Sequence, residues 1–371
     1  MSNYRNSRIE FLRILSMLLI TGRHVANPVL YLTQGAGYYI NDFICMSLLW
    51  GGKLGVVIFF TISAWFYAGK NSSIDFRKIL FLEKQTLFWA LTILAITSMI
   101  PSDYGFSRFS VKSLIVNMFP TIFNRWWYVT AYIFFLLLLP VLNRMLYSLT
   151  RTMHLYLCIM ALFLGWIYPM LPVGIVFSEY SVFTFLFIYI CIAYTRRYGQ
   201  EENVFLSSPM LFVYLTLLAF SSCVFLWLIV LQGFDSAMSL ATAFYTPTNP
   251  VFLGTAAALT KMMSMKSRHI IVIDALASCM FGVYILQTNI LISGWLWDTV
   301  ALSVLQKYTY SSFFVVMFAA LILMIVTAFC SVEALRKLLF RLLGIDMLIY
   351  SLGNKINETI EVKSKCIKKC W

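Results

Sequence analysis

The sequence predicts an all-α integral membrane protein, a polytopic bundle of about ten transmembrane helices with both termini in the cytoplasm. Hydrophobic residues make up 61% of the 371 positions and charged residues only 12%, whereas a water-soluble domain normally carries about 25% charged residues. Long apolar runs without polar alternation recur along the chain, and Lys and Arg collect at alternate ends of these runs. These observations exclude a soluble-domain interpretation.

The apolar runs are the candidate transmembrane helices. A helix needs roughly 20 apolar residues to cross about 30 Å of hydrocarbon, and the third run reaches this length only marginally. Runs this long without alternation exclude a β-barrel, which leaves helices as the structure that satisfies the backbone in lipid. We place the runs at residues 9–30, 44–69, 86–100, 126–146, 154–172, 180–195, 210–232, 244–263, 270–291 and 312–332.

The distribution of positive charge predicts the orientation. Of the 28 Lys and Arg residues, 22 fall at the termini and in connections on one side, and only four, Arg108, Lys112, Arg125 and Lys307, fall in connections on the other. Cytoplasmic loops retain positive charge, so both termini are expected in the cytoplasm and the helix number is expected to be even. The formal charge of +13 therefore results mostly from the cytoplasmic Lys and Arg residues that set the topology. We expect no nucleic-acid partner.

The chain is expected to form one membrane domain over residues 1–341, followed by a short basic cytoplasmic tail over 342–371. The first apolar run contains Arg23 and His24 and lacks a cleavage site, so it is expected to remain as a helix and not to be a signal peptide. The eight cysteines are scattered and imply no disulfide framework. No metal site is expected.

The first predicted helix carries the most informative polar residues. Arg13 and His24 are eleven residues apart, which places them on one helical face about 16 Å apart. Glu10, three residues before Arg13, can pair with it at the cytoplasmic boundary. Ionisable groups inside a membrane span normally face a cavity or a partner, so each is a functional hypothesis. A neutral His24 that only bridges two helices is the structural alternative.

Five sequence elements follow one another along the chain: Arg13 with His24 eleven residues further on, Gly55-Val-Val-Ile-Phe-Phe-Thr-Ile-Ser-Ala-Trp-Phe66, Trp126-Trp-Tyr-Val-Thr-Ala-Tyr132 closing in Pro140 and Asn143, Phe281-Gly-Val-Tyr-Ile-Leu-Gln287, and Glu333-Ala-Leu-Arg336. These elements and their order resemble the membrane-bound acyltransferase family 3. They are similar in particular to the branch found in capsule and exopolysaccharide gene clusters, in which an element like Asn249-Pro250 also recurs.

Two positions depart from the family pattern. Gln287 stands where many members have histidine, so a mechanism that needs two histidines would fail here and amide hydrogen bonding would have to replace it. The family often carries Arg-x-x-Arg after its second helix, where this chain reads Lys84-Gln-Thr-Leu87. Only the first cation of that element remains.

The resemblance implies transfer of an acyl group, expected to be acetyl, from acyl-coenzyme A to a hydroxyl of a cell-surface or lipid-linked polysaccharide sugar. Acyl-coenzyme A is then a donor substrate and no bound cofactor is expected; the setting is the bacterial cytoplasmic (inner) membrane. Transfer from a thioester needs a base for the alcohol, and histidine suits this task. His24 is the candidate base, either acting directly or through an acyl-histidine intermediate.

The remaining candidate residues divide into two groups. Coenzyme A phosphates cannot enter lipid, so they are expected to meet cytoplasmic cations: Arg13 with Glu10 at the mouth, and Arg77, Lys78 and Lys84 in the loop after the second helix. Counting residues along the helices places Tyr284 and Gln287 near the depth of His24. With Lys53, Asn289 and Trp127 they form the predicted acceptor-site or cavity group.

Structural and functional alternatives stay open at this stage. Tyr284 can be a packing aromatic, Lys53 can extend outward to the interface, and Trp127 can be an interfacial anchor. A buried Arg and His would also suit a polysaccharide flippase or polymerase, although no internal symmetry of the kind common in transporters is visible. A catalytically silent scaffold is the third class.

Overall fold

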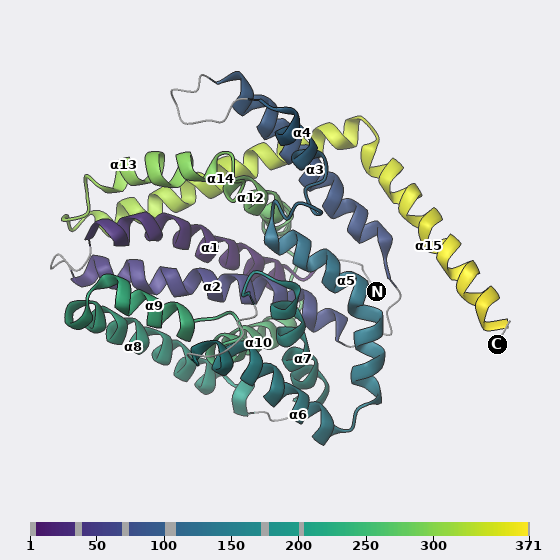
Figure 1. The fold of residues 1–371 in the computed structure, drawn as a ribbon, viewed down its shortest axis with the longest axis horizontal. Helices are drawn as coiled ribbons and strands as arrows, with labels where there is room; N and C mark the ends of the chain where they lie inside the picture. Colours follow the sequence, from purple (N-terminus) through teal and green to yellow (C-terminus); the bar gives the residue numbers. More distant parts are fainter. Residues whose placement is uncertain are drawn as a thin grey trace.

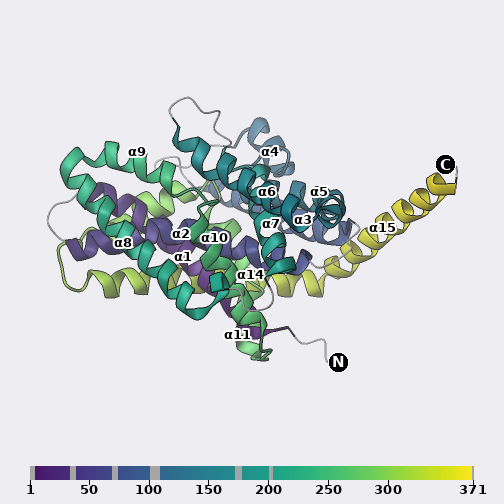
Figure 2. The ribbon, with the colours of Figure 1, turned by 90° about the horizontal axis from the view of Figure 1, so that it is seen from below.

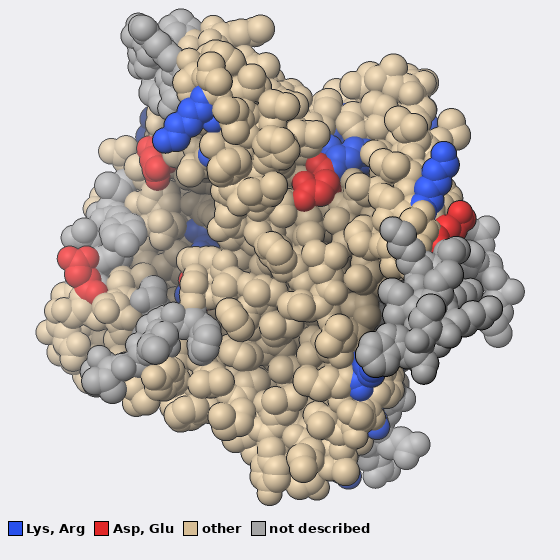
Figure 3. Space-filling model, turned by 45° about the vertical axis from the view of Figure 1, so that its right-hand side comes forward, with Lys and Arg blue, Asp and Glu red and all other residues tan. Residues whose placement is uncertain are grey.

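The computed structural model describes residues 5–33, 39–68, 74–100, 109–171, 178–199 and 204–369, and every regular element in these ranges is a helix (Figure 1). The all-helical prediction is therefore confirmed for this part of the chain. Lys70 and Arg108, which entered the charge count, lie outside the described residues. The surface in Figure 3 is mostly free of charged side chains, as expected for a protein that faces lipid.

Helices α1 (Ser7–Thr33) and α2 (Tyr39–Tyr67) lie side by side through the middle of the bundle (Figure 1). Two glycines of α2 allow this close approach. A Cβ at Gly55 would lie 2.6 Å from the backbone oxygen of Ser16, and one at Gly52 would lie 2.2 Å from Cβ of Arg23. A larger residue at either position would push the two helices apart. Helix α1 therefore holds its polar residues directly against α2.

Six described helices are long and apolar enough to cross a membrane. They are α2, α3 (Phe76–Met99), α5 (Trp127–Ser148), α6 (Arg151–Leu162) with its continuation to Met170, α8 (Ser208–Gln232) and α14 (Phe314–Leu342). Four further predicted spans are also helical but are shorter or carry more charge: α1, α7 (Val182–Tyr198), α10 (Pro250–Ser264) and the pair α11 (Ile271–Ala277) and α12 (Met280–Gln287). The count of ten spans and the orientation stay predictions.

Several helix boundaries differ from the predicted ones. The eighth predicted span, 244–263, contains the last residue of α9 (Phe234–Phe244) and all of α10 except its last residue. The side chain of Asn249 caps α10 and Pro250 occupies its first turn, which is where proline favours a helix start. Elements that were not predicted include α4 (Val111–Met118), the π-helical turn η5 (Trp295–Ala301) and α13 (Leu302–Leu305).

Helix α14 is joined to α3 and α12 through Glu333. This fully buried carboxylate accepts hydrogen bonds from Arg336, from Gln85 at 3.0 Å and from the indole nitrogen of Trp89 at 2.9 Å. Gly282 of α12 lies against the same carboxylate, because a Cβ there would be 2.3 Å from Cδ of Glu333. One buried acid therefore fixes three helices.

The end of the chain forms α15 (Ile345–Lys369), which extends away from the bundle in both ribbon views (Figures 1 and 2). Its middle is fixed to the start of α3: the Asn357 side chain accepts from the backbone N–H of Phe76 at 3.1 Å and donates to Asp75. Residues 345–369 are thus helical, a feature that the prediction of a short basic tail did not include.

Candidate active site

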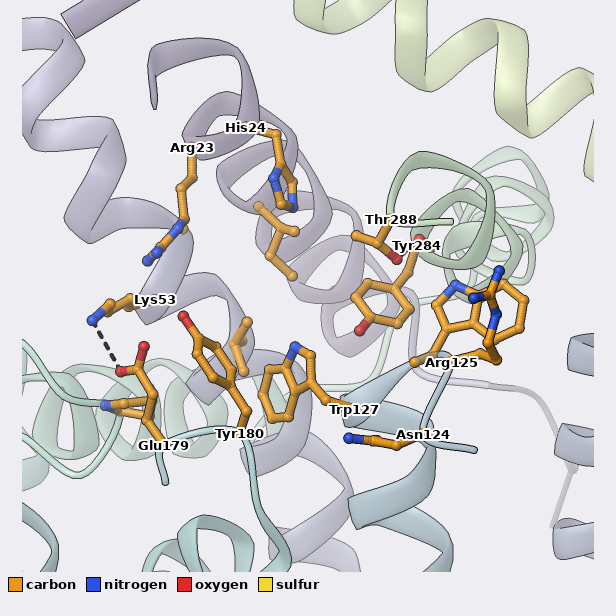
Figure 4. A pocket seen from close by; sticks show the side chains of 15 residues that line it. Arg23, His24, Lys53, Asn124, Arg125, Trp127, Glu179, Tyr180, Tyr284 and Thr288 are labelled. Carbon is orange, nitrogen blue, oxygen red and sulfur yellow. Dashed lines mark hydrogen bonds and ion pairs between the residues drawn. The ribbon is translucent and has the colours of Figure 1, made fainter. Parts of the chain in front are cut away.

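A cavity of about 300 Å³ lies beside His24; we call it the His24 cavity (Figure 4). Its wall comes from α1, α2, the turn before α5, the segment before α7, and α12. The lining residues are Ile20, Arg23, His24, Gly52, Lys53, Val56, Asn124, Arg125, Trp126, Trp127, Glu179, Tyr180, Pro247, Tyr284 and Thr288. The predicted juxtaposition of His24, Lys53, Tyr284 and Trp127 is therefore present in the structure.

The His24 ring is held by an aromatic stack. It lies nearly parallel to the indole of Trp297, with 5.3 Å between the ring centroids and 15° between the planes. The indole nitrogen of Trp297 in turn donates to the backbone oxygen of Gln287 at 3.1 Å. Trp297 thus links the imidazole to the end of α12. A ring fixed in this way has a defined direction in which to exchange a proton.

Lys53 does not extend outward to solvent. Its side chain is 5% exposed, and its Nζ donates to Oε2 of Glu179 at 2.9 Å. Glu179 belongs to the short segment before α7, and Figure 4 shows its carboxylate next to the Lys53 amine, with a dashed line between them. A buried amine of this kind needs an opposite charge nearby, because an unpaired charge away from water is costly.

The two tryptophans at the start of α5 have different positions. Trp126 is buried, and its indole nitrogen donates to the backbone oxygen of Ile285 at 3.0 Å, which attaches α5 to α12. Trp127 packs against the ring of Tyr180, with 5.2 Å between centroids, and faces the His24 cavity (Figure 4).

A second, larger cavity of about 620 Å³ lies beside Arg13; we call it the Arg13 cavity. Arg13 is paired with Glu10, since its Nη1 is 2.8 Å from both carboxylate oxygens, as predicted from their spacing. The charged lining residues of this cavity are six cations, Arg5, Arg13, Lys78, Lys84, Arg336 and Lys337, and two acids, Glu333 and Asp346. Positive charge therefore dominates.

The predicted donor residues divide between this cavity and its rim. Lys84 pairs with Asp346 of α15, and Lys78 donates to the hydroxyl of Tyr67 at 3.0 Å; both line the Arg13 cavity. Arg77 is not among its lining residues and instead donates to Asp75 at 2.8 Å. Leu87, the departure from the family pattern, is 38% exposed and belongs to the outer surface of α3.

Two aromatic side chains separate the cavities. Tyr128 lines the Arg13 cavity, Tyr284 lines the His24 cavity, and their ring centroids are 5.5 Å apart. Phe59, which also lines the Arg13 cavity, packs edge-on against Tyr128 at 5.8 Å. At this point only the Tyr128 and Tyr284 side chains lie between the basic cavity and the histidine-containing cavity. We call this pair the tyrosine partition.

Two predicted cavity residues lie behind the wall. Gln287 is fully buried, accepts from the Thr21 hydroxyl at 2.8 Å and is not a lining residue of either cavity. Asn289 is also buried and accepts from the backbone N–H of Leu291 at 2.9 Å, which is a local turn contact. Gln287 therefore connects α12 to Thr21 of α1, which lies three residues before His24 on that helix.

Several residues of the site were not singled out from the sequence. Glu179 and Tyr180 follow a connection with no pattern of its own, and Trp297 lies in a π-helical turn that was not predicted. Arg125 was noted only as one of the few cations on the other side of the protein. The only sequence feature that could have indicated the charged ones is an acid or a cation next to an apolar run.

Comparison with known proteins agrees with the sequence resemblance. The family model described as an acyltransferase domain matches residues 6–333. This range includes α1 to α12 and most of α14, and with them both cavities except for the contributions of Arg5, Arg336, Lys337 and Asp346. Neither the curated proteins nor the solved structures gave a match. The chain therefore belongs to the membrane-bound acyltransferase family 3.

Proposed function

We propose that the protein transfers an acyl group, expected to be acetyl, from acyl-coenzyme A to a hydroxyl of a cell-surface or lipid-linked polysaccharide sugar, with His24 as the base. The observation that carries this proposal is the pairing of the two cavities. A basic cavity suited to phosphates and a cavity containing histidine and aromatic residues meet at Tyr128 and Tyr284. Family membership supports acyl transfer in general.

The Arg13 cavity suits the charged head of the donor. Coenzyme A carries several phosphates, which are bound best by Arg and Lys side chains that can form charge-assisted hydrogen bonds. Arg336 uses Nε and one terminal nitrogen for Glu333, while its Nη1 is buried without a partner. Arg13 keeps about a third of its side-chain surface exposed despite its pairing with Glu10. Both guanidinium groups are therefore placed to meet a phosphate.

We propose that the thioester of the donor reaches His24 through the tyrosine partition. A donor whose phosphates stay in the Arg13 cavity can reach His24 only if its flexible arm passes between Tyr128 and Tyr284. In this proposal, a change of rotamer at Tyr128 or Tyr284 connects the two cavities and lets the arm of the donor pass.

In the proposed reaction, a ring nitrogen of His24 takes the proton of the sugar hydroxyl while the sugar oxygen attacks the thioester carbonyl carbon. The carbonyl oxygen becomes an oxyanion, for which the hydroxyl of Tyr284 is the candidate donor; Figure 4 shows it directed into the cavity. Collapse of this intermediate breaks the C–S bond. The coenzyme A thiolate then receives the proton from the imidazolium, which returns His24 to its neutral state.

We favour direct base catalysis over an acyl-histidine intermediate, because the direct route requires only that a ring nitrogen of His24 take up a proton.

The test is the release of acetate from surface polysaccharide. Polysaccharide purified from a strain that carries the gene should release acetate on mild alkaline treatment, and polysaccharide from the deletion strain should not. Polysaccharide that reaches the surface in normal amount and contains no acyl group in either strain would contradict the proposal. Polysaccharide that is missing from the surface of the deletion strain would favour a flippase or polymerase.

A further inference from the structure

Arg125 is a half-buried cation, and two of its guanidinium nitrogens are buried without a partner among the described residues. It lines the His24 cavity, and its Nε and Nη2 atoms are shielded from solvent without a hydrogen-bond partner. None of the ion pairs in the described ranges includes it. Buried polar groups are almost always paired, so an unpaired guanidinium next to a cavity calls for a ligand.

The backbone holds Arg125 in this position. Its N–H donates to the backbone oxygen of Pro120 at 2.9 Å, and the preceding residue, Asn124, has a φ of 49°. This left-handed conformation is uncommon for residues other than glycine and is tolerated best by asparagine and aspartate. On the other side, Trp126 is attached to α12 through its indole nitrogen. The turn is thus built to bring the guanidinium to the cavity wall.

The other charges around the cavity leave Arg125 without compensation. Glu179 is the only acid lining the His24 cavity among the described residues, and it is paired with Lys53. Arg23 also lines a neighbouring cavity that contains Asp298. The charge of Arg125 has no such counterpart in the described part of the chain.

We propose that the acceptor carries a negatively charged group, a carboxylate or a phosphate, which binds to Arg125 while the reacting hydroxyl faces His24. This inference rests on the proposed acyl transfer and specifies the class of its acceptor. Arg binds carboxylate and phosphate through two parallel N–H donors, so the anion would fix the orientation of the sugar as well as its position.

The size of the cavity limits the distance between the anion and the hydroxyl. A volume of about 300 Å³ is at the lower end of the range for small-molecule sites. The charged group therefore belongs to the acylated sugar ring or to its direct neighbour. It is either the carboxylate of an acidic sugar or the diphosphate of a lipid-linked sugar.

The first test is the chemical structure of the product. Mass spectrometry of the acylated polysaccharide should show the acyl group on an anionic sugar or on the ring next to one. If the polymer contains no acidic sugar, the comparison is made on isolated precursors. Acylation of the lipid-linked sugar, but not of the same sugar without its lipid diphosphate, would agree with the inference. Acylation of a neutral repeating unit with and without the diphosphate would overturn the inference and leave the proposed acyl transfer intact.

The second test compares Arg125→Gln and Arg125→Lys with Lys307→Gln, which removes an exposed cation that lines neither cavity. At matched protein levels, Arg125→Gln should lower acyl transfer about 10- to 100-fold, the range expected for a lost charge-assisted pair. Arg125→Lys should retain an intermediate activity, and Lys307→Gln should retain full activity. Acyl-coenzyme A binding should not change in any of the three.

Equal transfer rates in all three variants would overturn the role of Arg125. If Arg125→Gln fails to accumulate, the Arg125→Lys variant provides the test. Lysine keeps the positive charge but lacks the two parallel N–H donors, so full activity of this variant would contradict recognition of the anion by paired donors. Absence of acyl groups from every surface and lipid-linked sugar would instead contradict the proposed function itself.

Discussion

Replacing the buried acid Glu333 by leucine is expected to destabilise the protein by about 3 to 5 kcal/mol, the range measured when one partner of a buried ion pair is removed. Arg336 would be left buried and unpaired, because two of its nitrogens donate to this carboxylate. The indole N–H of Trp89 and the amide of Gln85 would also lose their acceptor. The contact between α3 and α14 should weaken most.

Replacing Arg336 by methionine should destabilise the protein less, because Glu333 keeps the donors on Gln85 and Trp89. The double replacement removes both charges. Replacing a buried ion pair by apolar residues of similar size is often close to neutral, so the double variant should be more stable than the Glu333→Leu single variant. The expected coupling between the two sites is at least about 2 kcal/mol, within the range for groups in direct contact.

The free energy of unfolding can be measured by titrating purified protein in mixed micelles with a denaturing detergent and following helicity by circular dichroism. If the two single losses add up to the loss in the double variant, the two charges are independent. That result would refute the assignment of Glu333 as the acid that joins α3 and α14 by neutralising Arg336.

Three further predictions concern the donor site, the last helix and the topology. Arg13→Ala should weaken acyl-coenzyme A binding far more than Arg125→Ala in isothermal titration calorimetry, because only Arg13 lines the basic cavity; equal losses would contradict a donor site there. Hydrogen bonds from Arg77 and from Asn357 of α15 hold the pKa of Asp75 below its usual value. The ionised carboxyl therefore stabilises the contact between α3 and α15 at neutral pH, and this stabilisation is lost as the pH falls through the lowered pKa. Spin-label distances between the two helices should increase in that acidic range, and Asp75→Asn should already show the longer distance at neutral pH; a pH-independent distance in the unmodified protein would contradict this role. Reporter fusions should indicate the cytoplasm after Arg197 and the outside near Lys307, and an outside signal at Arg197 would contradict the ten-helix topology.

The local features of the first helix were predictable from the sequence because they depend on helical spacing alone. The Arg13–Glu10 pair follows from a separation of three residues. The depth estimate that brought His24 and Tyr284 to one level is likewise arithmetic on a regular helix. In the structure both residues line one cavity.

Long-range partners were not predictable in this way. Glu179 pairs with Lys53 across 126 residues of sequence, and nothing in either segment indicates the other. Gln287 was expected in the cavity by depth, but depth does not fix direction, and its side chain reaches Thr21 on α1 instead. The position of Trp297 next to His24 was not predictable from helical spacing, because a π-helical turn shifts side chains away from that spacing.

Some boundary errors had a visible signal. Asn249-Pro250 is a cap followed by proline in the first turn, which indicates the start of α10 and not the interior of a longer helix. In α15, apolar residues that include Met347 and Leu348 alternate with polar ones at helical intervals, although the segment as a whole is polar. Its docking on α3 depends on particular contacts such as Asn357 with Asp75, which composition does not reveal.

The role of His24 is tested most directly by comparing the acylation of surface polysaccharide by His24→Gln, His24→Ala and His154→Gln at matched protein levels. His154 is the control, because it is a buried histidine of α6 that lines neither the His24 cavity nor the Arg13 cavity. If His24 is the base, both of its variants should lose acylation by about 10² to 10⁴ in rate while they remain in the membrane, because glutamine cannot take up a proton. The control should retain activity. Substantial acylation by a correctly inserted His24→Gln variant would contradict general-base catalysis by His24 and leave it only a packing role against Trp297.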